Sequence, residues 1–139
     1  MTFSSGLVEL VLIVDDVPRA AAFYRDVVGL RPYSDHNDAW AWFWTGAVGD
    51  VTAGRLALHR GSLLHEEHTP RPTPDGSSPF GQVHCAFRVT SDRIDEALET
   101  LRRNNVAIHG PNDLDWMNAR SWYFYDPDGN LLEYWMPRD

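Results

Sequence analysis

A single carboxylate, Glu133, interrupts an apolar run near the end of the sequence, NLLEYWMP (130–137). If this run forms a β-strand, Glu133 shares one face with Leu131 and Trp135, and the opposite face is apolar as well. A carboxylate buried without a partner costs several kcal/mol or shifts its pKa. The sequence therefore predicts a buried acid whose charge is offset by a neighbouring group.

Two other ionisable residues occupy matching positions in a pair of strand-like segments. The segments are LVELVLIVDD (7–16) and QVHCAFRVTSD (82–92), and an offset of 75 residues places Glu9 over His84. The same offset places Asp16 over Ser91. Asp and Ser are favoured helix N-caps, so we expect each strand to lead into a helix that begins there.

Apolar residues with the spacing of a helix follow both strand-like segments. Apolar residues recur every three or four positions from Val17 to Val28 and from Ile94 to Leu101. Gly29 follows the first run and Asn104–Asn105 the second, and both residue types tolerate the left-handed conformation that ends many helices. The two halves therefore share a strand–helix beginning.

Each helix is followed by further strand-like segments, and the last two are joined by the turn signal DPDGN (126–130). The segments are 30–33, 39–45 and 54–60 in the first half, and 106–109, 121–125 and 131–136 in the second. Residues 61–81 are rich in Pro, Ser and Gly and are expected to form a linker. The prediction is an α+β protein with two tandem βαβββ modules, residues 7–60 and 82–137.

Composition points to an intracellular protein that binds small molecules. The chain has 12 basic and 20 acidic residues, a net charge of −8, which argues against nucleic acid or an anionic membrane as the main partner. Its one cysteine, Cys85, cannot form an internal disulfide, and we expect it to be a small buried hydrophobe in a reducing cytoplasm. We see neither a signal peptide nor an apolar span of about 20 residues.

The motifs AAFYRDVVGL (21–30) and YFYDPDGNLLEYW (123–135), set in duplicated βαβββ modules, resemble the vicinal oxygen chelate superfamily. That group includes glyoxalase I, fosfomycin-resistance enzymes, extradiol dioxygenases, epimerases and bleomycin-resistance proteins. The resemblance implies mixed sheets that curl into an open half-barrel around a divalent metal or a ligand. It also implies a homodimer.

The resemblance also implies a set of metal ligands on the first and last strands of the modules. The matching positions are Glu9, His84 and Glu133. A fourth falls on Ala57, or on His59 if a strand bulge shifts the register. Such mixed nitrogen and oxygen ligands suit Zn, Ni, Mn, Co or Fe(II). Dioxygenases of the superfamily use a His, His, Glu pattern, from which Glu9 departs.

Aromatic residues supply candidates for a substrate pocket. The alternating tryptophans in AWAWFW share one face if this segment is a strand. That face could be a wall of the ligand cavity, part of the sheet core or a dimer interface. Arg120 and Tyr123, which follow the loop-like segment DWMN, could orient an anionic or carbonyl ligand, or lie at the surface. The pocket candidates are Trp40, Trp42, Trp44, Trp122, Trp135, Arg120 and Tyr123.

Two functions remain open on the sequence alone. One is a metal-dependent lyase or isomerase, in which the ion acts as a Lewis acid on a small oxygen-chelating substrate and Glu133 or Glu9 serves as general base. The alternative is a metal-free protein of the bleomycin-resistance type that sequesters a bulky aromatic or cationic compound. The acidic charge and the tryptophan stripe support the second, and the matching ligand positions lead us to prefer the first.

Overall fold

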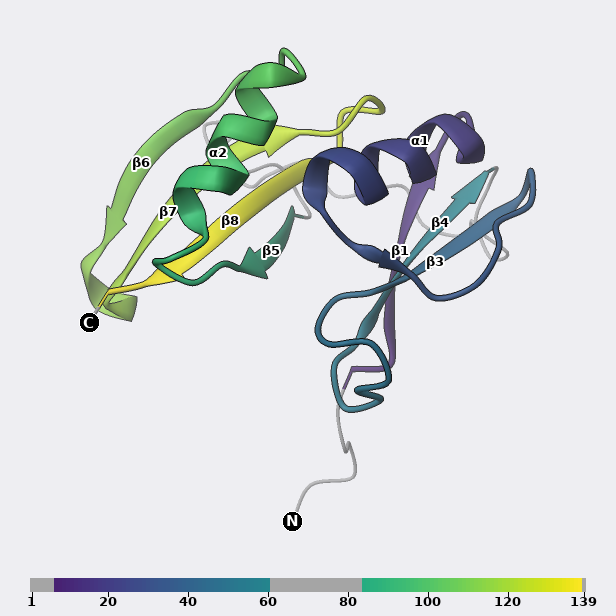
Figure 1. Cartoon of the computed structure of the whole chain (residues 1–139), viewed down its shortest axis with the longest axis horizontal. Coiled ribbons are helices and arrows are strands. Elements are labelled where there is room, and N and C mark those ends of the chain that lie inside the picture. Colours follow the sequence, from purple (N-terminus) through teal and green to yellow (C-terminus); the bar gives the residue numbers. More distant parts are fainter. Residues whose placement is uncertain (1–6, 61–83, 139) are drawn as a thin grey trace, which may run out of the picture. The chain divides into compact units, whose positions relative to one another are not determined.

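The computed structural model describes residues 7–60 and 84–138, and the chain divides into two compact units, residues 1–64 and 65–139 (Figure 1). The linker predicted at 61–81 lies outside the described residues. No helix in the described part is long and apolar enough to cross a membrane. Each unit contains one four-stranded mixed sheet and its own helix.

The first unit has its strands in the order β1-β4-β3-β2, with β1 parallel to β4 and the other pairs antiparallel. Its elements are β1 (Glu9–Val14), α1 (Val17–Phe23), the π-helical turn η1 (Tyr24–Val28), β2 (Arg31–Pro32), β3 (Trp40–Trp44) and β4 (Arg55–Arg60).

The second unit repeats this topology in the order β5-β8-β7-β6, again with the first and last strands parallel. Its elements are β5 (His84–Arg88), α2 (Ile94–Arg103), β6 (His109–Leu114), the 3-10 turn η2 (Asp115–Met117), β7 (Ala119–Tyr125) and β8 (Leu131–Pro137). Two mixed sheets built from βαβββ modules confirm the predicted fold class.

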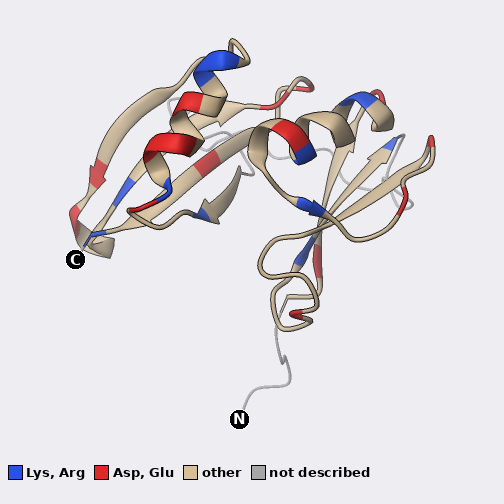
Figure 2. Ribbon diagram, viewed as in Figure 1, with Lys and Arg blue, Asp and Glu red and all other residues tan. Residues whose placement is uncertain are grey.

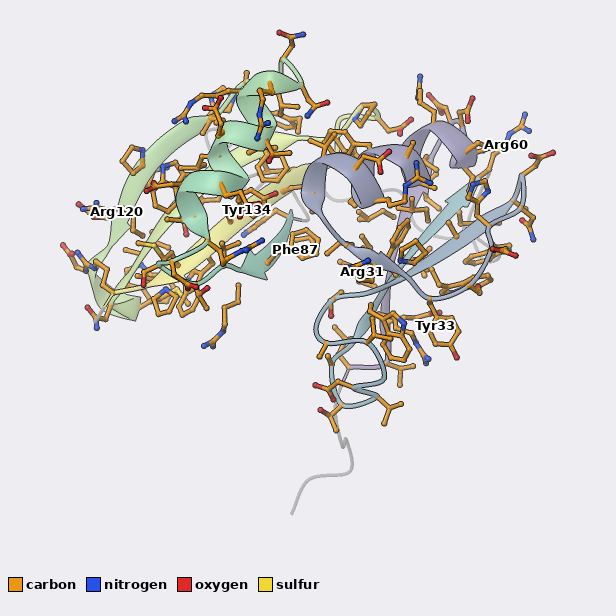
Figure 3. All side chains as sticks on the ribbon, in the orientation of Figure 1. Arg31, Tyr33, Arg60, Phe87, Arg120 and Tyr134 are labelled. Atoms are coloured by element: carbon orange, nitrogen blue, oxygen red, sulfur yellow. The ribbon has the colours of Figure 1, made fainter. Side chains whose placement is uncertain are left out.

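The core of the second unit lies between the sheet and α2 (Figures 1 and 3). Because side chains alternate along a strand, Phe124 and Leu132 fall on the same face as Tyr134, and all three are buried. Leu98 and Leu101 of α2 are buried too. The helix thus takes one face of the sheet, and the opposite face is left for Glu133 and its neighbours.

The first helix begins and ends where the sequence predicts. The Asp16 carboxylate accepts a hydrogen bond from the Arg19 backbone N–H at 2.9 Å, which makes it the N-cap. Gly29 ends the helical region with φ of 85°, a left-handed conformation that costs glycine little. The last turn is π-helical rather than α-helical, which apolar spacing alone does not reveal.

The second helix begins later than predicted. Ser91 is not its N-cap, because a turn intervenes and α2 starts at Ile94 without a side-chain cap. The acidic first turn and basic last turn complement the helix dipole instead (Figure 2). After the helix, Asn105 has a positive φ of 59°, as expected for its position.

Strand β6 is the largest departure from the predicted elements. The sequence predicts a strand at 106–109, whereas the structure has it at His109–Leu114. The sequence misses this position because Gly110 and Pro111 carry a turn signal. Proline is tolerated on an edge strand, where half of the backbone groups face away from the sheet, and β6 is the edge of its sheet. Leu114 is half-buried, and the other residues of this strand are exposed.

Candidate metal and substrate site

A cleft of about 440 Å³ lies on the face of the second sheet opposite α2. Its volume falls in the range of roughly 300–1,000 Å³ that small-molecule sites occupy. Side chains from β5, β7 and β8, from the end of β6 and from the turn η2 line it. The lining residues are His84, Ala86, Leu114, Trp116, Met117, Tyr123, Glu133 and Trp135.

Glu133 is the polar centre of this cleft and is 4% exposed. Its Oε1 accepts a hydrogen bond from the Ser121 hydroxyl at 2.5 Å, and Ser121 is fully buried. Its Oε2 lies 3.2 Å from Nε2 of His84. The predicted burial of Glu133 is confirmed, and the groups that offset it are a hydroxyl and an imidazole.

The His84–Glu133 geometry fits two adjacent coordination positions of one ion. Ligands bound at about 2.1 Å would lie about 3.0 Å apart in octahedral and about 3.4 Å apart in tetrahedral geometry. The observed 3.2 Å separation of the two donor atoms falls between these values. Across residues 7–60 and 84–138 no three His, Cys, Asp or Glu side chains converge, so the pair would form part of a site.

Tyr123 stands opposite Glu133 in the pairing of β7 with β8 and is 7% exposed. Burial, and then the nearby Glu133 carboxylate, raise the pKa of Tyr123 above its usual value. The phenol therefore stays protonated at neutral pH and can donate a hydrogen bond. Its ring meets the His84 imidazole edge-on, with the centroids 6.2 Å apart.

Comparison with known families identifies the superfamily of the chain. The sequence matches the family model of the Glyoxalase/Bleomycin resistance protein/Dioxygenase superfamily over residues 6–134. The chain belongs to this superfamily. The resemblance inferred from the two sequence motifs is thereby confirmed.

Relatives within the superfamily include fosfomycin-resistance proteins. The metallothiol transferase FosB of Lysinibacillus sphaericus is 27% identical over 125 residues, covering 90% of this chain and 77% of that protein. FosX of Listeria monocytogenes is 25% identical and covers 93% and 87%. Mn(II) is present in a solved FosX structure, with a dihydroxypropylphosphonic acid, at 23% identity and a TM-score of 0.64 over 95% of this chain and 90% of FosX.

Solved structures share the fold over almost the whole chain. An integron cassette protein from the mobile metagenome of a Halifax Harbour sewage outfall is 27% identical, with a TM-score of 0.68 over 96% of this chain and 99% of its own. A glyoxalase/dioxygenase from Nostoc punctiforme gives a TM-score of 0.69 at 24% identity, over 97% and 92%. The comparisons therefore support the fold across both units.

Strand register locates the fourth superfamily ligand position at Ala57. In the second unit Glu133 pairs with Ala86 of the first strand, and in the first unit Ala57 pairs with the equivalent Val11. The β1–β4 ladder runs without a break through all six pairs. The β1–β4 ladder therefore holds no bulge that would bring His59 to this position.

Glu9 and His59 cannot share an ion within the first unit. His59 pairs with Ile13, four residues beyond Glu9, which is a separation of about 13 Å along the strand. The His59 ring stacks on Trp40 at 3.9 Å, and its Nδ1 lies 3.0 Å from the Ala39 carbonyl oxygen. Glu9 is exposed, on the edge strand β1 of its sheet.

The alternating tryptophans share one face of β3, as predicted. This is the face opposite α1, because the intervening Ala41 and Phe43 are the buried residues. Trp40 and Trp42 stack in parallel, 5.3 Å apart with an angle of 3° between their planes. Their role in a ligand pocket remains a prediction.

Two other pocket candidates lie away from the cleft. Trp122 is buried on the α2 side of the sheet, opposite Tyr134, because it alternates with Tyr123 along β7. Arg120 pairs with Asp113 of β6 at 2.8 Å, toward the outer edge of the unit (Figure 3). Because side chains alternate along β7, neither residue lines the cleft.

The sequence does not by itself reveal several residues that line the cleft or hold Glu133. Ser121 carried a signal, since it is polar within an otherwise apolar strand. Trp116 and Met117 carried none, because a position in a loop does not indicate where a side chain points.

Cys85 is half-buried rather than fully buried. Burial raises the pKa of Cys85 to about 11, so this thiol is protonated at neutral pH.

Proposed function

We propose that this chain is a metal-dependent enzyme that binds a small molecule through two adjacent oxygens and catalyses a lyase, isomerase or related reaction. The observation that carries the proposal is the His84–Glu133 pair, 3.2 Å apart in a cleft of about 440 Å³. Support comes from the superfamily, whose relatives include a metallothiol transferase and a glutathione transferase.

In this proposal His84 and Glu133 supply two ligands, and Glu9 is the expected third. Imidazole and carboxylate ligands suit Zn, Ni, Mn, Co or Fe(II). The bound ion would polarise a substrate carbonyl and stabilise the charge that develops on its oxygen.

The protein's own groups divide the remaining work. Ser121 holds one oxygen of Glu133 and so leaves the other directed toward His84. The protonated Tyr123 hydroxyl, which hydrogen-bonds the Glu133 carboxylate, transfers this bond to a substrate oxygen. Glu9 or Glu133 accepts the substrate proton as general base. The apolar side chains around the cleft exclude water, which strengthens each of these interactions.

Metal analysis of the tag-free protein tests the proposal. We expect a near-stoichiometric divalent metal in the wild type, and its loss from the His84→Ala variant because one of the ligands is removed. His59→Ala is the matched control and should retain the metal, since that imidazole stacks on Trp40. A wild-type protein without metal, even after reconstitution, would reject the enzyme proposal.

A metal-free binding protein is the second candidate. It is favoured by the lining of the cleft, most of which is apolar, and by the net charge of −8, which would attract a cation. In that case His84 and Glu133 would hydrogen-bond the ligand directly. The outcome that supports it is absence of metal together with quenching of tryptophan fluorescence by aromatic or cationic compounds.

Removal of the Ser121 hydroxyl should weaken metal binding without abolishing it. Ser121→Ala leaves one oxygen of Glu133 buried without its donor, so the carboxylate is no longer held in one orientation. Loss of a group that orients a ligand typically lowers metal affinity by roughly 10–100-fold. Competition with a chromophoric chelator measures this, with the exposed Ser34→Ala as control. Unchanged affinity would show that Ser121 only fills space.

A further inference from the structure

The turn η2, between β6 and β7, forms part of the cleft wall although little packing anchors it. Trp116 and Met117 line the cleft, yet Trp116 is 81% exposed and Met117 is 42% exposed. Within the described part of the chain, none of the three residues of η2 is buried. Because few apolar contacts fix this segment, its position depends on polar contacts.

Those polar contacts converge on Arg138, the residue that follows β8. Its backbone N–H donates to the Asn118 carbonyl oxygen at 2.8 Å, and its own carbonyl oxygen accepts from the Asn118 side-chain amide at 2.8 Å. Its guanidinium pairs with the first residue of the turn, since Nη2 lies 2.7 Å from Oδ1 of Asp115. Nη1 lies 3.7 Å from Oδ1 of Asp113. One residue thus binds both ends of η2 to the end of β8.

Arg138 is too far along β8 to touch an ion held by His84 and Glu133. Five residues separate it from Glu133, which corresponds to about 17 Å along an extended strand. Its side chain is 29% exposed and pairs with two carboxylates, so its attraction to them exceeds that of a fully exposed pair. An effect of Arg138 on a ligand therefore passes through η2 and not through the metal.

We propose that Arg138 is a positioning residue of the cleft, which binds η2 to the end of β8 and so keeps Trp116 and Met117 in place against a bound ligand. Loss of the guanidinium releases Asp115 but leaves the two bonds between the Arg138 backbone and Asn118. The sheet then persists while this part of the wall becomes mobile. The inference rests on the proposed function and adds a residue that sets ligand affinity without contacting ligand or ion.

Two hydroxamates test this role on the Co(II)-loaded full chain. Both are neutral in solution and chelate an ion through the same pair of oxygens. Biphenyl-4-hydroxamic acid carries two rings that extend from the ion toward η2, whereas acetohydroxamic acid ends at a methyl group. We expect Arg138→Gln to weaken the biphenyl probe about fivefold, the upper end of what a partly exposed ion pair contributes. Acetohydroxamic acid and Co(II) should bind as in the wild type, as measured from the Co(II) absorption spectrum.

Asp115→Asn removes the same ion pair from the side of the turn and should reproduce the loss. Asp115 is 86% exposed, so this substitution carries little risk to the fold. Glu96→Gln is the matched control, because it breaks an exposed pair with Arg93 on α2, at 3.1 Å. It should change the affinity of neither probe.

A double-mutant cycle with Trp116→Ala separates positioning from a general effect on the fold. Trp116→Ala alone should weaken the biphenyl probe about tenfold, because it removes apolar surface that the rings cover. In that background Arg138→Gln should add about twofold or less, since the main side chain that it positions is gone. An equal loss for both probes, or the full effect of Arg138→Gln in the absence of Trp116, would assign Arg138 to the fold alone and overturn the inference.

Unchanged binding of the biphenyl probe to Arg138→Gln or to Trp116→Ala would also overturn the inference, while the metal site stands. Failure of the wild type to load Co(II) would instead remove the proposed function, and the inference with it. The Co(II) spectrum recorded before any probe is added distinguishes the two failures.

Discussion

The Glu133→Gln variant is expected to lose divalent metal and yet to unfold at higher denaturant concentration than the metal-free wild type. Glutamine keeps the shape of the side chain, and its carbonyl oxygen can still accept the bond from Ser121. It lacks the charge that an ion requires, so the loss of affinity should exceed the roughly 10–100-fold seen when only an orienting partner is removed. Because the His84 side chain is 38% exposed, it does not become an unpaired buried charge, and removing the desolvation cost of the carboxylate should stabilise the metal-free protein by about 1 kcal/mol.

Opposite signs for metal affinity and stability are the diagnostic result. Metal content is measured by elemental analysis, and the free energy of unfolding by urea titration in the presence of a chelator. Glu99→Gln on the exposed side of α2 is the control, and its change should stay within about 0.5 kcal/mol. A destabilised Glu133→Gln variant would mean that the carboxylate, paired with His84 and Ser121, serves the fold rather than an ion.

The sequence predicts the duplicated fold because the two modules repeat both their apolar spacing and their helix-ending residues. It predicts Glu133 because a carboxylate between two apolar faces demands a partner. It does not predict β6, whose Gly110 and Pro111 carry a turn signal although they form an edge strand. Nor does it decide between Ala57 and His59, since that choice depends on a ladder between strands far apart in the chain.

The buried polar side chains lie in the second unit because the equivalent positions of the first unit carry apolar or aromatic side chains. By register, Ala57 of the first unit corresponds to Glu133, and Trp40 corresponds to Ser121. Where the second unit has a carboxylate and the hydroxyl that holds it, the first has a methyl group and an indole stacked on His59. The duplication thus supplied one polar face and one aromatic face from the same architecture.

The polar face depends on the apolar face behind it, so Phe124→Ala is expected to cost about 3–5 kcal/mol of unfolding free energy. Phe124 is fully buried, and its ring centroid lies 4.8 Å from that of Tyr134. Phe124 faces α2 and follows Tyr123 by one position on β7. Collapse around the cavity that the missing ring leaves would therefore also displace the strand that carries Ser121. Thermal and urea denaturation measure the loss.

Tyr125→Ala is the matched control, because it truncates the next aromatic residue on the same strand, which points to the other face and is 47% exposed. It should cost about 1 kcal/mol or less. Equal costs for the two variants would contradict the assignment of Phe124 to the core. A large cost for Phe124→Ala alone would place the stability of β7 on its α2 side, which leaves the cleft side free to hold residues chosen for chemistry rather than for packing.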